Sequence, residues 1–315
     1  MLTLACSPNK PAPAPAAAVG ALELRSVMPE FWRWWASVEH ASIDQQAAGF
    51  WNVIVHAHPE LYSPSVMGPK FSDETAARAT IRAYFEKLPP VLADMRAISA
   101  RMPQLLRDGY ARFSATFPDV RWRGPVYIMP SLFKFDGGTR PLDGKPQLFF
   151  APDGIAKYHG GDSQPDDQCA FFAHELFHIY HQQFFAPDPH QDMSVWQQLW
   201  IEGLATYVGA RLCPRATEAE ILLSATLAAE TRPMLTTLAH ELRGELAATD
   251  DATLTRWFAA GTSGEVPSRA GYYLGYLVAR DAARTHPLPQ LARLDVSTIQ
   301  HLIETGLDAL APASE

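Results

Sequence analysis

The sequence predicts a mainly helical α+β protein in which a small β-sheet precedes a strongly apolar helix. Three observations support this fold class. Apolar residues make up 47% of the 315 residues and charged residues only 19%, which is typical of a chain with a large packed core. Apolar side chains recur at helical spacing through most of the chain. Two short β-favouring segments interrupt this pattern before the apolar helix begins.

The charge balance restricts the kind of partner. The chain carries 26 basic and 34 acidic side chains, a formal net charge of -8. This balance argues against a nucleic-acid partner, which requires a basic face. No run of about eighteen apolar residues is present, so we expect no membrane-spanning helix.

Residues 1–21 resemble the end of a bacterial lipoprotein signal followed by a linker. Cys6 follows a short apolar stretch and precedes the Pro/Ala-rich residues 8–18. Thr3 stands where such signals usually carry leucine, and the apolar stretch is short for a working signal unless translation starts upstream of Met1. One interpretation is a lipidated Cys6 that tethers the protein to the membrane, with a cell-envelope or periplasmic location. The other is a solvated tail on a cytoplasmic protein.

Residues 22–118 are predicted to form an N-terminal helical subregion. Helical spacing begins at Pro29 and ends at Pro59, a second helix is expected over 72–88, and a third over 90–117.

Residues 119–315 are predicted to form the second region, and we expect both regions to make one continuous domain. Strands are expected over 121–129 and 147–151, with a Gly/Pro/Asp-rich loop over 135–146 between them. Helices are then expected over 168–185, 194–212, 217–230, 233–247, 252–260, 268–285 and 297–310. Capping boxes are expected at Ser194/Gln197, Thr217/Glu220 and Ser297/Gln300.

The helix expected over 168–185 contains an HExxH sequence. His174 and His178 are four residues apart, so their imidazoles lie on one face and can reach one zinc ion. Glu175 would project beside them toward a water molecule. This is the arrangement that zinc-dependent hydrolysis needs. The structural alternative is an apolar helix whose histidines are merely hydrogen-bonded.

A catalytic zinc takes three protein ligands and leaves one position for water. Glu202 is the favoured third ligand, because it lies 24 residues after His178 on the following helix and its neighbours are apolar. Gly203 and Ala205 would let the two helices approach closely. His181 is the weaker candidate, because three ligands from one straight helix would strain a tetrahedral site.

The HExxH sequence at 174–178 followed by Glu-Gly-Leu-Ala at 202–205 resembles the gluzincin clan of zinc metallopeptidases. More narrowly, it is similar to the predicted bacterial zinc-dependent proteases of an uncharacterised domain family. The strand pair before the metal helix and the segment Gly-Tyr-Tyr-Leu-Gly-Tyr at 271–276 are similar too. The resemblance covers about residues 120–285. It implies a zincin-like domain that holds Zn²⁺ with His174, His178 and Glu202.

Two tyrosines are candidates for a catalytic role. The resemblance points first to Tyr272 and second to Tyr276, which are one turn apart on the helix expected over 268–285. A phenol hydroxyl near the metal can stabilise the oxyanion that forms during hydrolysis. The residues alone favour a simpler reading, in which these two and Tyr273 are core aromatics.

Two further cysteines and three further histidines have expected positions. Cys169 and Cys213 lie on helices that we expect to pack together, and they could pair in an oxidising compartment. His159 could line the cleft. His56 and His58 are expected at the surface or at a helix end.

The sequence therefore predicts a zinc-dependent peptidase in which Glu175 acts as general base on a zinc-activated water. The expected substrate is a peptide or protein, and the strand over 147–151 is the candidate edge along which an extended peptide could pair. Two alternatives remain: a non-catalytic zinc-binding envelope module, and a hydrolase of a non-peptide amide. The sequence does not fix the cleavage preference or the oligomeric state.

Overall fold

The computed structural model describes residues 22–311, except 123, 160–164, 187–190 and 262–263. The predictions for residues 1–21, including Cys6, therefore lie outside the described residues.

The N-terminal part of the chain is helical, as predicted, apart from one short strand. Its elements are β1 (Leu24–Ser26), α1 (Met28–Val38), α2 (Ile43–Phe50), the π-helical turn η1 (Trp51–Val55), α3 (Pro64–Met67), η2 (Pro69–Ser72), α4 (Glu74–Lys87), η3 (Pro89–Val91) and α5 (Leu92–Thr116). The helical spacing between 29 and 59 covers two helices and not one. The break comes at Ser42, whose side chain accepts a hydrogen bond from the backbone of Gln45 in a capping box.

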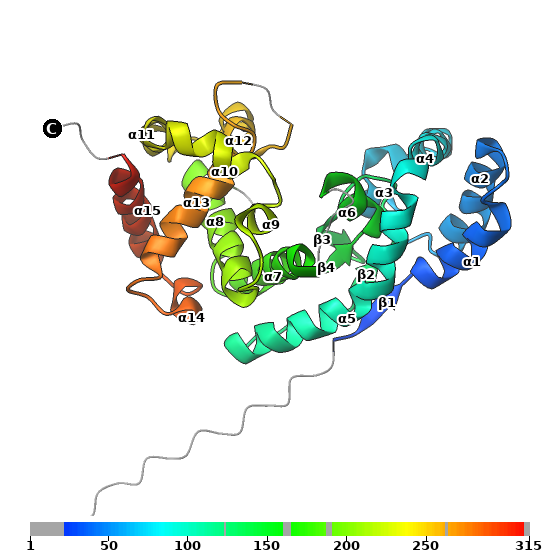
Figure 1. The fold of residues 1–315 in the computed structure, drawn as a ribbon, viewed down its shortest axis with the longest axis horizontal. Coiled ribbons are helices and arrows are strands. Elements are labelled where there is room, and N and C mark those ends of the chain that lie inside the picture. The colour runs from blue at the N-terminus through cyan, green and yellow to red at the C-terminus, as the bar shows by residue number, and fades with distance from the viewer. Residues whose placement is uncertain (1–21, 123, 160–164, 187–190, 262–263, 312–315) are drawn as a thin grey trace, which may run out of the picture.

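The sheet has four strands in the order β1-β2-β4-β3 (Figure 1). The later three strands are β2 (Val126–Ile128), β3 (Gly137–Leu142) and β4 (Lys145–Phe150). β1, β2 and β4 run parallel, and β3 pairs antiparallel with β4. The prediction of a loop over 135–146 is wrong, because this segment contains β3 and a tight turn. Asp143 and Gly144 both have positive φ, 51° and 72°, as a two-residue hairpin turn requires.

The position of β4 in the sheet corrects a second expectation. The strand expected over 147–151 is not an edge, because β4 pairs with β2 on one side and with β3 on the other. No other described strand pairs with the outer side of β3, so β3 is the edge on this side of the sheet.

The rest of the chain is helical. Its elements are α6 (Pro152–Tyr158), α7 (Pro165–His181), α8 (Val195–Leu212), α9 (Glu218–Leu222), α10 (Leu227–Thr231), η4 (Arg232–Met234), α11 (Leu235–Glu245), α12 (Asp251–Phe258), α13 (Ala270–Ala282), α14 (Leu288–Leu291) and α15 (Val296–Leu310). The capping boxes at Ser194 and Thr217 are present. The box predicted at Ser297 is wrong, because Asp295 caps α15 by accepting a hydrogen bond from Thr298 N.

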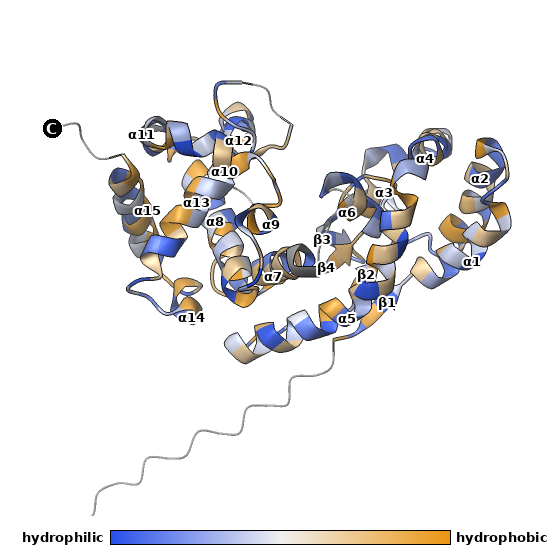
Figure 2. Cartoon of the chain, in the orientation of Figure 1, coloured by the Kyte–Doolittle hydropathy of each residue, from blue (hydrophilic) through white to orange (hydrophobic). Residues whose placement is uncertain are grey.

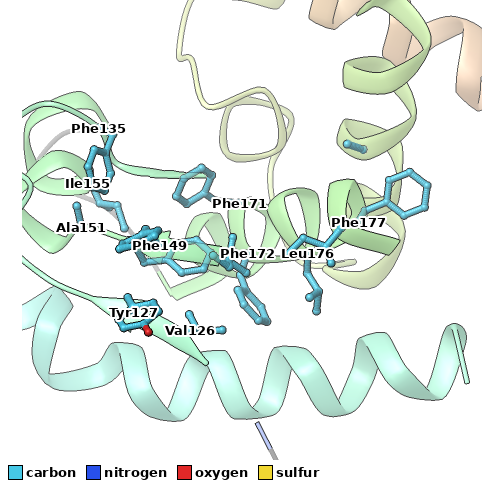
Figure 3. Close-up of a cluster of buried hydrophobic side chains, with 14 of the residues drawn as sticks. Val126, Tyr127, Phe135, Phe149, Ala151, Ile155, Phe171, Phe172, Leu176 and Phe177 are labelled. Carbon is cyan, nitrogen blue, oxygen red and sulfur yellow. The ribbon is translucent and has the colours of Figure 1, made fainter. Parts of the chain in front are cut away.

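The sheet and α7 pack together over α5 (Figure 1). Figure 3 shows Phe172 and Leu176 pointing from α7 toward α5, beside Val126 of β2. Gly109 of α5 makes this packing possible, since a Cβ atom there would lie 2.5 Å from a ring carbon of Phe172. One face of α7 is therefore buried in this core, and His174 and His178 lie on another face of the helix.

α8 packs against α7 on one side and against α13 on the other. Cys169 of α7 and Cys213 at the end of α8 form a disulfide bond, as the sequence allowed. α5 carries both apolar and polar bands along its length (Figure 2). Within the described residues, none of the helices combines the length and the apolarity needed to cross a bilayer.

Candidate metal centre

The HExxH segment lies on α7, with both imidazoles on one face. The Nε2 atoms of His174 and His178 are 3.0 Å apart, and the two rings are almost perpendicular. This is the consequence of placing two histidines four residues apart on a helix. Both side chains are largely buried, with exposed fractions of 9% and 15%.

α8 brings Glu202 to the same point. Its Oε2 atom lies 3.2 Å from Nε2 of His174 and 3.4 Å from Nε2 of His178. The other carboxylate oxygen, Oε1, accepts a hydrogen bond of 3.0 Å from the amide of Gln198, one turn earlier on α8. That bond orients the carboxylate so that Oε2 faces the imidazoles.

The three donor atoms fit a zinc ion. They form a triangle with edges of 3.0, 3.2 and 3.4 Å. Ligand bonds of about 2.0–2.1 Å in a tetrahedral zinc site place the ligand atoms about 3.3 Å apart, which matches these edges. The carboxylate of Glu175 also lies within 4.8 Å of the imidazoles, but Glu202 is the residue that closes the triangle.

Thr206 supports this arrangement from the next turn of α8. Its hydroxyl donates a hydrogen bond of 2.8 Å to the carbonyl oxygen of Glu202, and it lies 3.4 Å from Nδ1 of His174. Because the hydroxyl proton is used by the carbonyl, His174 Nδ1–H is left to donate to the threonine oxygen. The Nε2 lone pair of His174 then remains available to a metal ion.

The charges at the centre influence one another strongly. Burial alone would raise the pKa of Glu202, but the positive charge of His178 and its hydrogen bond to the carboxylate act against burial, and this pKa lies far below its usual range. Burial, together with the charges of Glu202 and Asp136, raises the pKa of Glu175 to about 7. The pKa values of these two neighbouring carboxylates are therefore shifted in opposite directions, so that Glu202 is ionised at neutral pH and Glu175 can gain or lose a proton there.

Glu175 faces the edge of the sheet. A Cβ atom built at Gly138 of β3 would lie 3.7 Å from Oε2 of Glu175. The side chain of Arg140, two residues further along β3, lies 3.9 Å from the centre of the Phe135 ring. Arg140 and the site lie in one pocket, where its charge lowers the pKa of Glu175 against the effect of burial.

The metal pocket has a volume of about 800 Å³. It is lined by Lys134, Phe135, Asp136, Gly137, Arg140, Tyr158, His159, Phe171, His174, Glu175, His178, Glu202, Leu223, Ser224, Thr226, Glu230, Phe258, Ala260, Ser268, Arg269 and Tyr272. These residues come from both sides of α7: the sheet edge and its loops on one side, and segments 223–230 and 258–272 on the other. The pocket is large enough for several residues of an extended chain.

Tyr272 of α13 stands next to the metal centre. Its ring stacks on that of His174 with a centroid distance of 6.3 Å and an angle of 20°. The guanidinium of Arg269 lies over the same tyrosine ring, 4.2 Å from its centre. Burial raises the pKa of Tyr272, and the charge of Glu202 raises it further. The phenol therefore keeps its proton and is a hydrogen-bond donor.

The other sequence candidates lie elsewhere. Tyr276 does not belong to the pocket lining and packs near Tyr207 and Tyr273. His181 stacks between Phe177 and Phe185, and its Nε2 has no hydrogen-bond partner among the described residues. Burial lowers the pKa of His181 to about 3, so it is an uncharged core residue.

His159 lines the pocket, as the sequence allowed, and its Nε2 lies 2.8 Å from Oδ2 of Asp136. Other pocket residues were not found from the sequence. Three of them lie where no regular spacing in the sequence indicates a site. Asp136 is in an irregular loop, Arg140 is on the edge strand β3, and Arg269 is at the start of α13. Gln198 and Thr206 could have been found, because each is four residues from Glu202 and so shares its helix face.

Residues 148–300 match the family described as predicted Zn-dependent protease (DUF2268). No curated protein and no solved structure matches the chain. The matched segment begins in β4 and ends in α15, so it includes the whole of α7, α8 and α13. This match confirms the narrower of the two resemblances drawn from the motifs: over residues 148–300 this protein matches the predicted zinc-dependent proteases.

Proposed function

We propose that the protein is a zinc-dependent peptidase with a zincin-like catalytic region, in which His174, His178 and Glu202 hold the metal. The triangle of their three donor atoms carries this proposal, because its edges fit one face of a zinc tetrahedron. The fourth corner would face the pocket, as a catalytic zinc site requires. The family match supports the choice of zinc and of proteolysis.

Each residue around the metal has a distinct task. Zinc bound there supplies a Lewis acid that polarises a carbonyl group and acidifies water. The Glu175 carboxylate takes the proton of the attacking water and passes it to the leaving amine. The Tyr272 hydroxyl donates a hydrogen bond to the carbonyl oxygen as negative charge develops on it.

The edge of the sheet gives an extended peptide a place to bind. β3 is antiparallel to β4, no described strand pairs with its outer side, and a Cβ atom at Gly138 would lie 3.7 Å from Oε2 of Glu175. A peptide that paired with the backbone of β3 would pass the carboxylate that acts as base. Gly137 lines the pocket as well, so the backbone of β3 is close to the metal centre there.

Metal content tests the ligand set. We expect about one zinc per wild-type chain in elemental mass spectrometry after weakly bound ions are removed, and clearly less in Glu202→Ala. Glu230→Ala is the matched control, because Glu230 lines the same pocket and is exposed. It should keep the wild-type zinc content. Wild-type protein without zinc affinity would contradict the proposal.

Glu175→Gln separates a peptidase from a non-catalytic zinc module. The wild type should cleave members of a peptide library, and the variant should keep its zinc but lose cleavage. A module would bind zinc in both forms and cleave nothing. A wild type that hydrolyses simple amides but no peptide would favour the hydrolase of a non-peptide amide.

We also propose a cell-envelope location, with Cys6 as a lipid anchor. The Cys169–Cys213 disulfide bond supports this location, because such bonds persist in oxidising compartments. Cells treated with an inhibitor of the lipoprotein signal peptidase should accumulate a precursor. Unchanged processing would contradict lipidation.

A further inference from the structure

A second hollow lies apart from the metal ligands and is lined by four of the six lysines of the chain. It has a volume of about 520 Å³. It is lined by Lys70, Ala76, Ala79, Thr80, Ala83, Tyr84, Lys87, Leu132, Phe133, Lys134 and Lys157. We call it the lysine pocket. Its lining contains four lysines and no acidic residue.

This concentration is unusual for the chain. The sequence has six lysines, and four of them line this one hollow although the net charge is -8. They come from four separate segments: Lys70 from η2, Lys87 from the end of α4, Lys134 from the loop before β3, and Lys157 from α6. The fold therefore gathers them, since no run of basic residues in the sequence does so.

None of these four lysines forms an ion pair with another described residue. Arginines nearby behave differently. Arg78 pairs with Glu74, and Arg82 pairs with Asp44 and Glu86, although both arginines lie on α4 with Lys87. Four positive charges that face one hollow without a counter-charge repel one another, and a bound anion would remove that repulsion.

Small residues on α4 open the hollow. Ala76, Ala79, Thr80 and Ala83 follow one another at helical spacing on one face of that helix. Below them the rings of Tyr84 and Phe133 pack together, with centroids 4.7 Å apart. Such an apolar floor strengthens the attraction between the ammonium groups and an anion, because the local dielectric is lower than in water.

We propose that the lysine pocket binds a small anion that carries two or three linked phosphate groups. A volume of about 520 Å³ suits a small molecule. Lysine binds phosphate as a point charge, whereas planar carboxylate recognition typically uses the arginine fork, which this lining lacks. Four positive charges match a polyphosphate better than a single carboxylate or phosphate.

Lys134 also lines the metal pocket, so it is left unchanged in the test. The probes are inorganic phosphate, pyrophosphate and tripolyphosphate, measured by isothermal titration calorimetry on the full-length protein with its metal. Lys87→Gln removes one charge from the lysine pocket, and the triple variant Lys70→Gln/Lys87→Gln/Lys157→Gln removes three. All these side chains are exposed, so the variants should fold. Lys145→Gln is the control, because Lys145 is exposed and lies outside this lining.

We expect the affinity to rise at least tenfold from phosphate to tripolyphosphate, and to fall with salt. The triple variant should bind tripolyphosphate at least tenfold more weakly, Lys87→Gln should be intermediate, and Lys145→Gln should equal the wild type. Undiminished binding in the triple variant would place the anion at the metal pocket and overturn the proposal. Absence of tripolyphosphate binding at millimolar concentration, or tighter binding of poly-glutamate than of tripolyphosphate, would overturn it as well.

Discussion

The backbones of Gly203 and Gly275 touch where α8 crosses α13. A Cβ atom at Gly203 would lie 2.2 Å from the carbonyl carbon of Gly275, and one at Gly275 would lie 2.5 Å from the carbonyl oxygen of Leu199. Gly203 directly follows Glu202, and Gly275 lies three residues after Tyr272. The contact of the two glycines therefore sets how closely the carboxylate and the phenol can approach.

Gly203→Ala should destabilise the protein severely. An alanine inside a helix normally stabilises by up to about 1 kcal/mol relative to glycine. Here the methyl group would meet backbone atoms that cannot move without separating the helices, so we expect a loss of about 3 kcal/mol or more in the free energy of unfolding. Urea denaturation followed by circular dichroism measures this loss.

Gly244→Ala provides the matched control. Gly244 lies in α11, it is exposed, and no atom lies within 4 Å of a Cβ built there. This variant should be as stable as the wild type or slightly more stable. If both alanine variants were equally stable, the close crossing of α8 and α13 would be disproved.

The helices and the two histidines could be predicted because they rest on local spacing. Apolar periodicity placed α5, α7 and α8, and the four-residue spacing of His174 and His178 put both imidazoles on one helix face. These features depend on residues within a few turns of one another. Gly203 was expected to let α8 approach α7, but the helix that it contacts is α13, and Gly209 is the glycine of α8 that lies against the backbone of α7.

β3 could not be predicted from alternating hydrophobicity. Its sequence, Gly-Gly-Thr-Arg-Pro-Leu, lacks β-branched and aromatic residues apart from one threonine. Its pairing with β4 and the hairpin turn at Asp143-Gly144 make it a strand. The turn was the available signal, because Asp-Gly between two segments favours a hairpin.

The choice between the tyrosines also depended on tertiary structure. Tyr272 and Tyr276 share a face of α13, so helical spacing cannot tell which one reaches the metal centre. The crossing of α13 over α8 puts Tyr272 beside His174 and leaves Tyr276 near Tyr207. No local pattern in the sequence encodes that crossing.

Asp153 should make stability depend on pH. Its carboxylate is fully buried and accepts hydrogen bonds from the backbone of Ser131 and Phe133, at 2.8 and 3.0 Å. Burial raises its pKa to about 6 despite these bonds. Because the folded state binds this proton more tightly than the unfolded state, the group stabilises the fold at pH 4 and loses that contribution as the pH rises through 6.

The stability of Asp153→Asn isolates this effect, because asparagine does not titrate. The free energy of unfolding of the wild type, minus that of the variant, should fall by about 2 kcal/mol between pH 4 and pH 7. Urea denaturation at a series of pH values measures the difference and cancels the other titrating groups. A difference that is constant, or that grows with pH, would show that the hydrogen bonds outweigh burial.

The disulfide bond between Cys169 and Cys213 should stabilise the metal region. It joins α7 to the end of α8 across 44 residues. By the chain-entropy estimate, closing a loop of this length stabilises the fold by about 4 kcal/mol. Cys169→Ala/Cys213→Ala should lose most of that amount in urea denaturation, and Cys6→Ala should lose none. A double variant as stable as the wild type would show that the bond does not form.

Tyr272→Phe should lower the rate of hydrolysis without releasing the metal. The phenol hydroxyl is the donor proposed for the developing negative charge, and removing one such donor costs about a hundredfold in kcat. KM should change little, because the interaction forms in the transition state and not with the bound substrate. Zinc content should stay at the wild-type value, since the three ligand side chains are untouched.

Tyr276→Phe is the control for this measurement, because it removes the same oxygen one turn away, outside the pocket lining. It should keep the wild-type kcat. A Tyr272→Phe enzyme with full kcat would remove the hydroxyl from the mechanism, and a loss of zinc would show a role in assembling the site. Equal losses of kcat in both variants would mean that the tyrosines act through the packing of α13. The donor to the developing negative charge would then be another pocket residue, and His159 and Arg269 would be the first residues to substitute in order to find it.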